Sequence, residues 1–208
     1  MKESQATRDR LIDAFYRMAI RKGFDRTSVN DVLEVAGVKK GSFYYHFADK
    51  ESLGLAVLER DQADFYAMID ACLDAPTPLE GIPRFLAKAL QKHRQNGFVG
   101  GCLWGNTALE MSDSNAQYAT LVHQTFIVWG AKIEKAVREG QKCGQIRRDL
   151  SSESLAQWIV ASIEGGIMLS RLAKKPGPLN NCIKTMKIML LPGEASPTGG
   201  KNKGKKTT

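Results

Sequence analysis

Apolar residues recur at steps of three and four along almost the whole chain, and the strict alternation that is typical of strands is hard to find. The N-terminal segment illustrates the pattern, because its apolar positions fall on one face of a helix: Leu11, Ala14, Phe15, Met18 and Ala19. Such a helix buries one stripe and exposes the rest of its surface. Repeated along the chain, the pattern predicts an all-α fold of about nine helices.

Glycine, proline and helix-capping residues divide this pattern into segments. The first helix is predicted to end at Gly23. The segment from Ser28 to Asp31 resembles a capping box, so a short helix is predicted to begin there and to end at Gly37. Asp49 is placed to cap a later, longer helix. Further helices are expected over approximately residues 39–47, 49–73, 82–93, 102–111, 118–143, 151–173 and 179–190.

Composition and charge narrow the class of protein. The 208 residues are 43% hydrophobic, which suffices for a packed core, and they carry a formal net charge of +8. That charge favours an anionic partner such as nucleic acid without selecting one. No apolar run reaches the roughly 18 residues of a membrane-spanning helix, and the first residues contain no apolar signal core, so a cytoplasmic protein is expected. The four cysteines are far apart and form no Cys/His cluster, so neither a metal site nor a disulfide framework is expected.

The segment from Gly37 to Glu51 reads Gly-Val-Lys-Lys-Gly-Ser-Phe-Tyr-Tyr-His-Phe-Ala-Asp-Lys-Glu. A buried core gains nothing from this mixture. A helix presented to a DNA groove uses Lys and Ser to bind phosphate, and Tyr to reach sugars or base edges. Since Phe43 and Phe47 occupy the inward stripe of the predicted helix, its geometry turns Tyr44 and Tyr45 elsewhere.

Residues 8–58 as a whole resemble the DNA-binding domain of the TetR family of transcriptional regulators. In this sequence Thr-Ser-Val-x-Asp opens a helix, Ala-Gly-Val closes it, and Lys-Gly-Ser-Phe-Tyr-Tyr-His-Phe and Asp-Lys-Glu-Ser-Leu follow. Leu33 departs from the pattern, because many helix-turn-helix units place a smaller residue there, and it predicts slight repacking.

The resemblance implies a domain organisation and an activity. It places a helix-turn-helix DNA-binding domain at residues 1–50 and a ligand-binding and dimerisation domain at residues 51–191. Residues 192–208 are rich in Gly, Pro, Lys and Thr, and we expect a disordered basic tail. The family's usual activity is repression: a homodimer binds a palindromic double-stranded DNA operator and is released by a small-molecule effector. No membrane partner is expected.

The resemblance also implies which residues meet DNA. In a helix-turn-helix the second helix of the pair lies in the major groove, and the first crosses the backbone. Lys40 and Tyr44 are the best candidates for contacts with bases, and Gly41 allows close approach. Contacts with the DNA backbone are expected from Thr27, Ser28, Lys39, Ser42, Tyr45, His46 and Lys50. The alternative interpretation is a solvated lysine pair and half-buried tyrosines.

Pairing of two copies is expected to involve the last two helices. Small residues there allow helices to approach closely, and larger ones supply apolar area. The candidate contact residues are Trp158, Ile159, Ser162, Gly166, Cys182 and Met186. The alternative is that these residues fill the core of a single chain.

The helices between residues 82 and 172 carry the mixture of apolar and polar side chains that is typical of a ligand site. The candidate ligand-binding residues are Phe85, His93, Cys102, Trp104, Asn106, Glu110, Phe126, Trp129, Glu164 and Met168. Each aromatic among them, taken alone, is more often a core residue than a ligand contact. Glu164 lies among apolar neighbours, and a buried carboxylate needs a partner or a ligand. The alternative for Glu164 is a salt bridge, to Arg171 or to the other copy of a dimer.

Cys102 is a second candidate sensor. It follows Gly100-Gly101 at the predicted start of a helix, where the helix dipole favours a thiolate. Gly-Gly-Cys-Leu at this place is similar to the subset of TetR-like regulators that sense electrophiles or oxidants through a cysteine near this point. The alternative is an inert, buried thiol. Either signal is expected to shift the dimer between two states, with the helix from Glu51 to about Leu73 joining both halves.

Two other classes of protein compete with this interpretation. An enzyme is disfavoured, because no HExxH, GxSxG, phosphate-binding loop or dinucleotide fingerprint is present, so no catalytic residue and no cofactor are expected. A helical scaffold would leave the residues between Gly37 and Lys50 unexplained.

Overall fold

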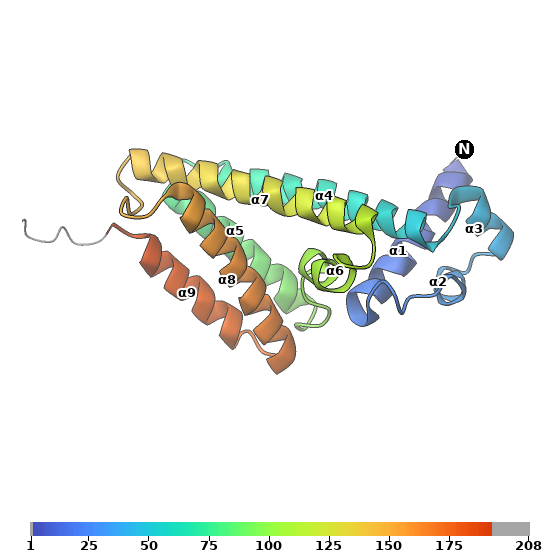
Figure 1. The fold of residues 1–208 in the computed structure, drawn as a ribbon. Coiled ribbons are helices and arrows are strands. Elements are labelled where there is room, and N and C mark those ends of the chain that lie inside the picture. The colour runs from blue at the N-terminus through green and yellow to red at the C-terminus, as the bar shows by residue number, and fades with distance from the viewer. Residues whose placement is uncertain (1, 193–208) are drawn as a thin grey trace, which may run out of the picture.

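The computed structural model describes residues 2–192, and this part of the chain is built from α-helices without strands. The helices are α1 (Lys2–Lys22), α2 (Val29–Ala36), α3 (Lys40–His46), α4 (Lys50–Leu73), α5 (Pro78–Gln95), α6 (Leu103–Met111), α7 (Ala116–Lys142), α8 (Ser152–Ala173) and α9 (Gly177–Leu190). Figure 1 shows α1 to α3 gathered at one end, α5, α8 and α9 toward the other, and the long helices α4 and α7 running between them. The predicted all-α class is confirmed. The predicted tail lies outside the described residues, apart from its first residue.

Capping residues set the helix boundaries as the sequence predicts. Ser28 and Asp31 form a reciprocal capping box at the start of α2, and Asp49 and Ser52 form another at the start of α4. Gly37 ends α2 in the left-handed region, at φ 62°, where a residue with a Cβ is strained. These boundaries fix the short turn that separates α2 from α3.

The helices enclose two clusters of buried side chains. One joins α1, α2 and α3 to the first half of α4, and it also takes in Leu103 and Trp104 of α6 and Tyr118 of α7. The other lies among α5, α7, α8 and α9 around Trp129. Packing is therefore continuous across the predicted domain boundary between residues 50 and 51. Helices α1, α2 and α3, which we call the N-terminal unit, pack against α4, α6 and α7. None of the described helices is long and apolar enough to cross a membrane.

Candidate nucleic-acid interface and internal cavity

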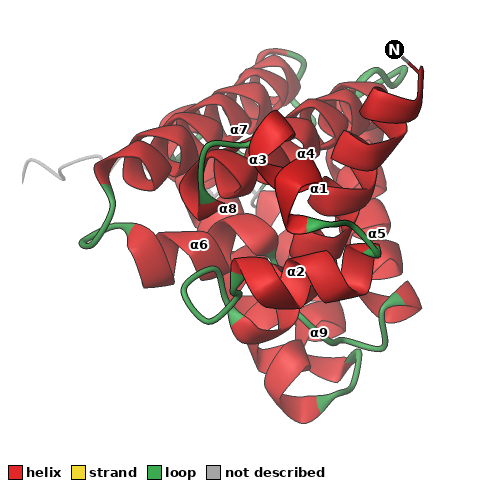
Figure 2. Cartoon of the chain, turned by 90° about the vertical axis from the view of Figure 1, so that its right-hand side faces the viewer, coloured by secondary structure: helices red, strands yellow, loops and turns green. Residues whose placement is uncertain are grey.

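Helix α3 separates its aromatic side chains onto two faces. Phe43 is 0% exposed and packs among α1, α2 and α4, whereas Tyr44 is 53% exposed and Tyr45 is 78% exposed. Figure 2 looks onto the end of the molecule where α1, α2 and α3 lie. The exposed surface of this segment also includes Lys39, Lys40, Gly41 and Ser42, with His46 half-buried beside the ring of Tyr45. The predicted division between inward phenylalanines and outward tyrosines is confirmed.

The structure gives three of the predicted phosphate contacts another role. Thr27 is 0% exposed, and its hydroxyl donates to the carbonyl of Gly23 at 2.7 Å, so its prediction as a DNA contact is wrong. The Ser28 hydroxyl accepts from the Asp31 N–H at 3.2 Å as the cap of α2, although Ser28 itself is exposed. The Lys50 ammonium donates to the carbonyls of Phe24 and Asp25, at 3.3 and 2.9 Å. Lys50 therefore holds the turn between α1 and α2, and its contact with a phosphate stays a prediction.

Glu110 is a further correction. Its carboxylate, at the end of α6, accepts from the N–H of Phe24 at 3.0 Å and from the N–H of Asp25 at 2.8 Å. It is thus turned toward the N-terminal unit and does not line the cavity described below. No sequence pattern indicates this contact, because Glu110 lies about 85 residues from its partners along the chain.

Six of the candidate ligand-binding residues line one internal cavity between α4, α5, α6, α7 and α8. They are Phe85, His93, Cys102, Trp104, Trp129 and Glu164. Asn106 and Met168 instead line a groove between α6 and α8, and Phe126 lines a groove between α7 and α8. Two residues of α1 that were not predicted, Tyr16 and Ile20, also line the cavity. Through them the cavity touches the helix-turn-helix unit directly.

Two polar atoms of the cavity walls are buried and have no hydrogen-bond partner among residues 2–192. They are Nε1 of Trp129, whose side chain is 2% exposed, and Oε1 of Glu164. By contrast, Nε1 of Trp104 donates to Asp61 at 2.8 Å. Burial lowers the pKa of His93 to about 4, so its imidazole is neutral at physiological pH. A buried donor and a buried acceptor without partners are groups that a ligand could satisfy.

The thiol of Cys102 does not have the expected thiolate character. Backbone N–H groups of Trp104 and Gly105, at the start of α6, do favour the anion. Burial and the nearby Glu164 carboxylate oppose it more strongly and raise the pKa of the Cys102 thiol well above its usual value. The predicted lowering of this pKa is therefore wrong for the structure described.

Glu164 has no salt bridge to Arg171, because the Arg171 guanidinium donates to Oδ1 of Asn106 at 2.8 Å. Burial raises the pKa of Glu164 to about 7, and a hydrogen bond with Cys102 offsets part of that rise. Gly105 of α6 faces this carboxyl group so closely that an added Cβ would lie 3.2 Å from Cδ of Glu164 and nearer still to Oε2. The Glu164 side chain of α8 thus reaches the backbone of α6 beside Cys102.

The raised pKa of Glu164 predicts a pH-dependent stability. Below the unfolded pKa the carboxyl is protonated in both states and costs nothing. As pH rises toward 7 the unfolded chain ionises first, so the folded state loses stability until its own pKa is passed. As pH rises from about 5 to about 7.5, the free energy of unfolding of Glu164→Gln should therefore increase by about 2–3 kcal/mol relative to that of the parent protein. Urea unfolding at several pH values measures this gain. Glu153→Gln, at an exposed position of the same helix, is the control, and an equal pH-dependent gain there would contradict the assignment.

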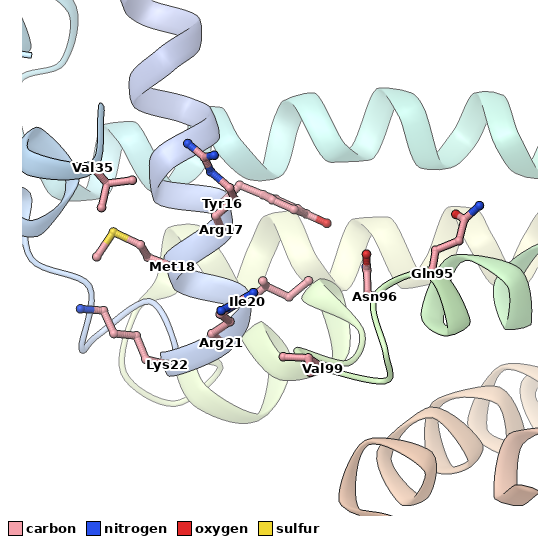
Figure 3. A pocket seen from close by; sticks show the side chains of 10 residues that line it. All are labelled: Tyr16, Arg17, Met18, Ile20, Arg21, Lys22, Val35, Gln95, Asn96 and Val99. Atoms are coloured by element: carbon pink, nitrogen blue, oxygen red, sulfur yellow. The ribbon is translucent and has the colours of Figure 1, made fainter. Parts of the chain in front are cut away.

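A further hollow lies outside the cavity and the two grooves. It is an open groove of about 780 Å³ between α1 and the connection from α5 to α6. Figure 3 shows Tyr16 of α1 extending toward Gln95 and Asn96, and Val99 lying close to Ile20. The groove leaves the side of α1 that faces α5 incompletely packed.

The predicted dimer contacts divide into two groups. Ile159 and Met186 are 0% exposed and fill the core of this chain. Gly166 is buried against Leu179 and Cys182, so it brings α8 and α9 together within one chain. For Ile159, Gly166 and Met186 the alternative interpretation holds, whereas Cys182 is half-buried and stays a candidate. Trp158 and Ser162 are half-buried.

The exposed apolar side chains of the last two helices lie at other positions. They are Met168, Leu169 and Leu172 on α8, and Ile188 and Met189 on α9. Leu172 is 82% exposed and Ile188 is 69% exposed, so these two helices carry apolar side chains that the described residues leave uncovered.

Comparison with known families decides the class of protein. The family described as "Bacterial regulatory proteins, tetR family" matches residues 11–57, and the family described as "Tetracyclin repressor-like, C-terminal domain" matches residues 78–186, which is more than half of the chain. The chain belongs to the TetR family. It is a DNA-binding transcriptional regulator and not an enzyme.

Individual TetR-family proteins are similar to this chain over most of its length. The HTH-type transcriptional repressor DhaR of Mycobacterium sp. (strain GP1) is 29% identical over 89% of this chain and 92% of its own. The transcriptional regulator AcuR of Cereibacter sphaeroides is 31% identical over 84% of this chain and 81% of its own. A crystal structure of regulatory protein TetR from Rhodobacter sphaeroides superposes with a TM-score of 0.83, at 29% identity, over 88% of this chain and 98% of that one.

Proposed function

We propose that this TetR-family chain acts as a homodimeric repressor, which binds a palindromic operator through α3 and is released by a small-molecule effector in the internal cavity. The observation that carries the proposal is the exposure of Tyr44 and Tyr45 beside Lys39 and Lys40, on a helix anchored by the buried Phe43. These exposed groups are those that bind phosphates and base edges. Because the operator is DNA, the proposed place of action is the cytoplasm.

The exposed apolar side chains of α8 and α9 support pairing with a second copy. One recognition helix reads few base pairs, and a two-fold pair doubles the sequence that is read. Met168, Leu172 and Ile188 are more than half exposed, and a second copy would remove them from water. Trp158 and Ser162 remain candidates at the edge of this surface.

The cavity supports an effector that is mostly apolar and carries a hydrogen-bond acceptor. Phe65, Phe85 and Trp129 supply apolar walls, and Nε1 of Trp129 offers an unused donor. Glu164, with a pKa of about 7, can donate or accept. The effector acts by binding more tightly to the released state than to the operator-binding state. Modification of Cys102 remains a second route to release, although the raised pKa of its thiol disfavours the reactive anion.

Selection of bound duplexes from a random pool tests this function. The expected product is a palindrome whose half-sites are centred about one helical turn, or a multiple of it, apart. A selected site with a single half-site would contradict the dimer. The absence of any enriched sequence would contradict sequence-specific DNA binding.

A further inference from the structure

We infer that the peptide groups of Phe24 and Asp25 transmit the state of the cavity to the recognition helix, and that Glu110 is the positioning residue that an effector disengages. This inference rests on the proposed function, and it adds to that proposal a defined point of coupling. It assigns to Glu110 a role in DNA binding although Glu110 is not predicted to touch DNA.

The turn between α1 and α2 is held from two sides by opposite charges. The Glu110 carboxylate of α6 accepts from the N–H groups of Phe24 and Asp25 at 3.0 and 2.8 Å. The Lys50 ammonium of α4 donates to the carbonyls of the same two residues at 3.3 and 2.9 Å. Hydrogen bonds that include a charged group are about twice as strong as neutral ones. We call this arrangement of Glu110, Lys50 and the two peptide units the turn clasp.

The local backbone leaves room for the carboxylate. Gly23 has φ 93°, and an added Cβ would lie 2.6 and 2.7 Å from the two carboxylate oxygens of Glu110. A side chain at this position would displace the Glu110 carboxylate from the N–H groups of Phe24 and Asp25. A glycine is therefore required both for the backbone conformation and for the approach of Glu110.

Helix α6 connects the turn clasp to the cavity. Its nine residues span roughly 13 Å, with Trp104 and the preceding N-cap residue Cys102 at the cavity end and Glu110 in the last turn. The preceding Gly100 rests on Ile20 of α1, where an added Cβ would lie 2.8 Å from Cγ1. A displacement of one end of so short and regular a helix moves the other end with it.

The cavity is too small to be filled without such a displacement. Its volume is about 40 Å³, room for a few water molecules, whereas sites for small organic ligands occupy about 300–1,000 Å³. An effector must therefore move the walls apart, and residues 101–104 at the start of α6 form one of these walls. The described form, with its small cavity and closed clasp, is then the effector-free form that binds the operator.

Because an open groove lies beside α1, the turn clasp contributes strongly to the orientation of the N-terminal unit. On the side that faces α5, α1 borders a space of about 780 Å³ and is not packed tightly (Figure 3). The N-terminal unit therefore takes its angle to the rest of the molecule from its contacts with α4, α6 and α7, among which the turn clasp supplies the charged hydrogen bonds. Opening the clasp from the α6 side frees that angle, and with it the spacing of the two recognition helices in a dimer.

The test compares Glu110→Gln with Asp113→Asn in the full-length protein. An amide at position 110 can accept from one N–H group but presents its own N–H toward the other. Asp113 is exposed, lies three residues further along the chain, and loses the same charge in the control. In Glu110→Gln, amide hydrogen exchange at Phe24 and Asp25 should accelerate at least about tenfold, and affinity for the selected operator should fall by about tenfold. Neither should change in Asp113→Asn.

A cavity-filling variant tests transmission without an identified effector. Ala89 of α5 lines the cavity and is 8% exposed, and the phenyl ring of Ala89→Phe exceeds the space available. This variant should weaken operator binding and accelerate exchange at Phe24 and Asp25 in the parent protein. It should weaken operator binding little further in Glu110→Gln, because the clasp is already open. If Ala89→Phe does not fold, Ala89→Leu serves the same purpose.

The outcomes separate the inference from the proposed function. Unchanged exchange at Phe24 and Asp25 in Glu110→Gln overturns the inference whether or not the protein binds DNA. Accelerated exchange with unchanged operator affinity also overturns it, while the parent protein's binding of the operator leaves the proposed function intact. Losses of affinity that multiply in the double variant would show that cavity and clasp act independently, and would overturn the inference too. If selection with the parent protein enriches no DNA sequence, the proposed function is contradicted.

Discussion

The K40A/Y44A variant is expected to bind the selected operator at least about 100-fold more weakly than the parent protein, since each base contact contributes about 1–3 kcal/mol and a dimer makes each contact twice. Both residues are exposed, so their removal opens no cavity in the core. Within the protein, the double substitution removes the edge-on packing of the Tyr44 ring on the Phe43 ring, whose centroids are 5.1 Å apart. The free energy of unfolding should therefore fall by less than about 1 kcal/mol.

Fluorescence anisotropy with labelled operator, repeated at several salt concentrations, measures this weaker binding. Removing Lys40 should reduce the slope of log affinity against log salt by about one for each phosphate that the lysine neutralises. Lys88→Ala, at an exposed position of α5, removes the same charge far from α3 and should leave operator affinity unchanged. A fall in affinity in K40A/Y44A no greater than that in Lys88→Ala would exclude α3 as the recognition helix.

Gly54→Ala should destabilise the protein by about 2 kcal/mol, although alanine is ordinarily favoured over glycine in a helix by about 1 kcal/mol. Gly54 lies in α4 opposite Tyr118 of α7, and an added Cβ would overlap the Tyr118 hydroxyl and lie 3.0 Å from Cζ. The ring cannot move freely, because its hydroxyl donates to the carbonyl of Glu51 at 3.2 Å and the side chain is 3% exposed. The substitution therefore forces α4 and α7 apart beside the start of α4.

Urea unfolding followed by circular dichroism measures the change. Gly130→Ala is a matched control, because Gly130 lies within α7 and has no atom within 4 Å of an added Cβ. That variant should gain up to about 1 kcal/mol. Tyr118→Phe, which removes the overlapping oxygen, should relieve part of the destabilisation when combined with Gly54→Ala. Stabilisation by Gly54→Ala alone would refute the close contact of α4 and α7.

Features that depend on neighbouring residues could be predicted from the sequence. The caps at Ser28 and Asp49, the left-handed Gly37 and the inward Phe43 each follow from local backbone chemistry or from the helical repeat. The outward position of Tyr44 follows from the same repeat, once Phe43 is assigned to the core.

Features that depend on distant partners could not be predicted in the same way. Lys50 resembles a phosphate contact by its place in the motif, yet its partners are carbonyls 25 and 26 residues earlier. Glu110 shares α6 with Trp104, which suggests a place in the cavity, but a helix turns successive residues to different sides. The raised pKa of Cys102 depends on burial and on Glu164, both of which come from neighbouring helices distant in the sequence.

For a helix with two apolar faces, the spacing of apolar residues does not predict which face is buried. On α8, Ile159 and Ile163 face the core, while Met168 and Leu172 face outward. The sequence shows that both sets are apolar, but only the packing of α8 against α7 and α9 shows which set is buried. The same ambiguity places Met186 in a predicted interface although it is 0% exposed.

The turn clasp grips main-chain atoms, and this has a consequence for how such regulators can diversify. Amide hydrogens and carbonyl oxygens are common to every residue except proline, which lacks the hydrogen, so the outward side chain at Asp25 is free to change without loosening the grip. A helix-turn-helix unit with a different DNA sequence preference could thus be combined with the same effector-binding domain, provided that Gly23 is retained. A regulator could thus acquire a new combination of effector and operator while the contacts that couple its two domains stay the same.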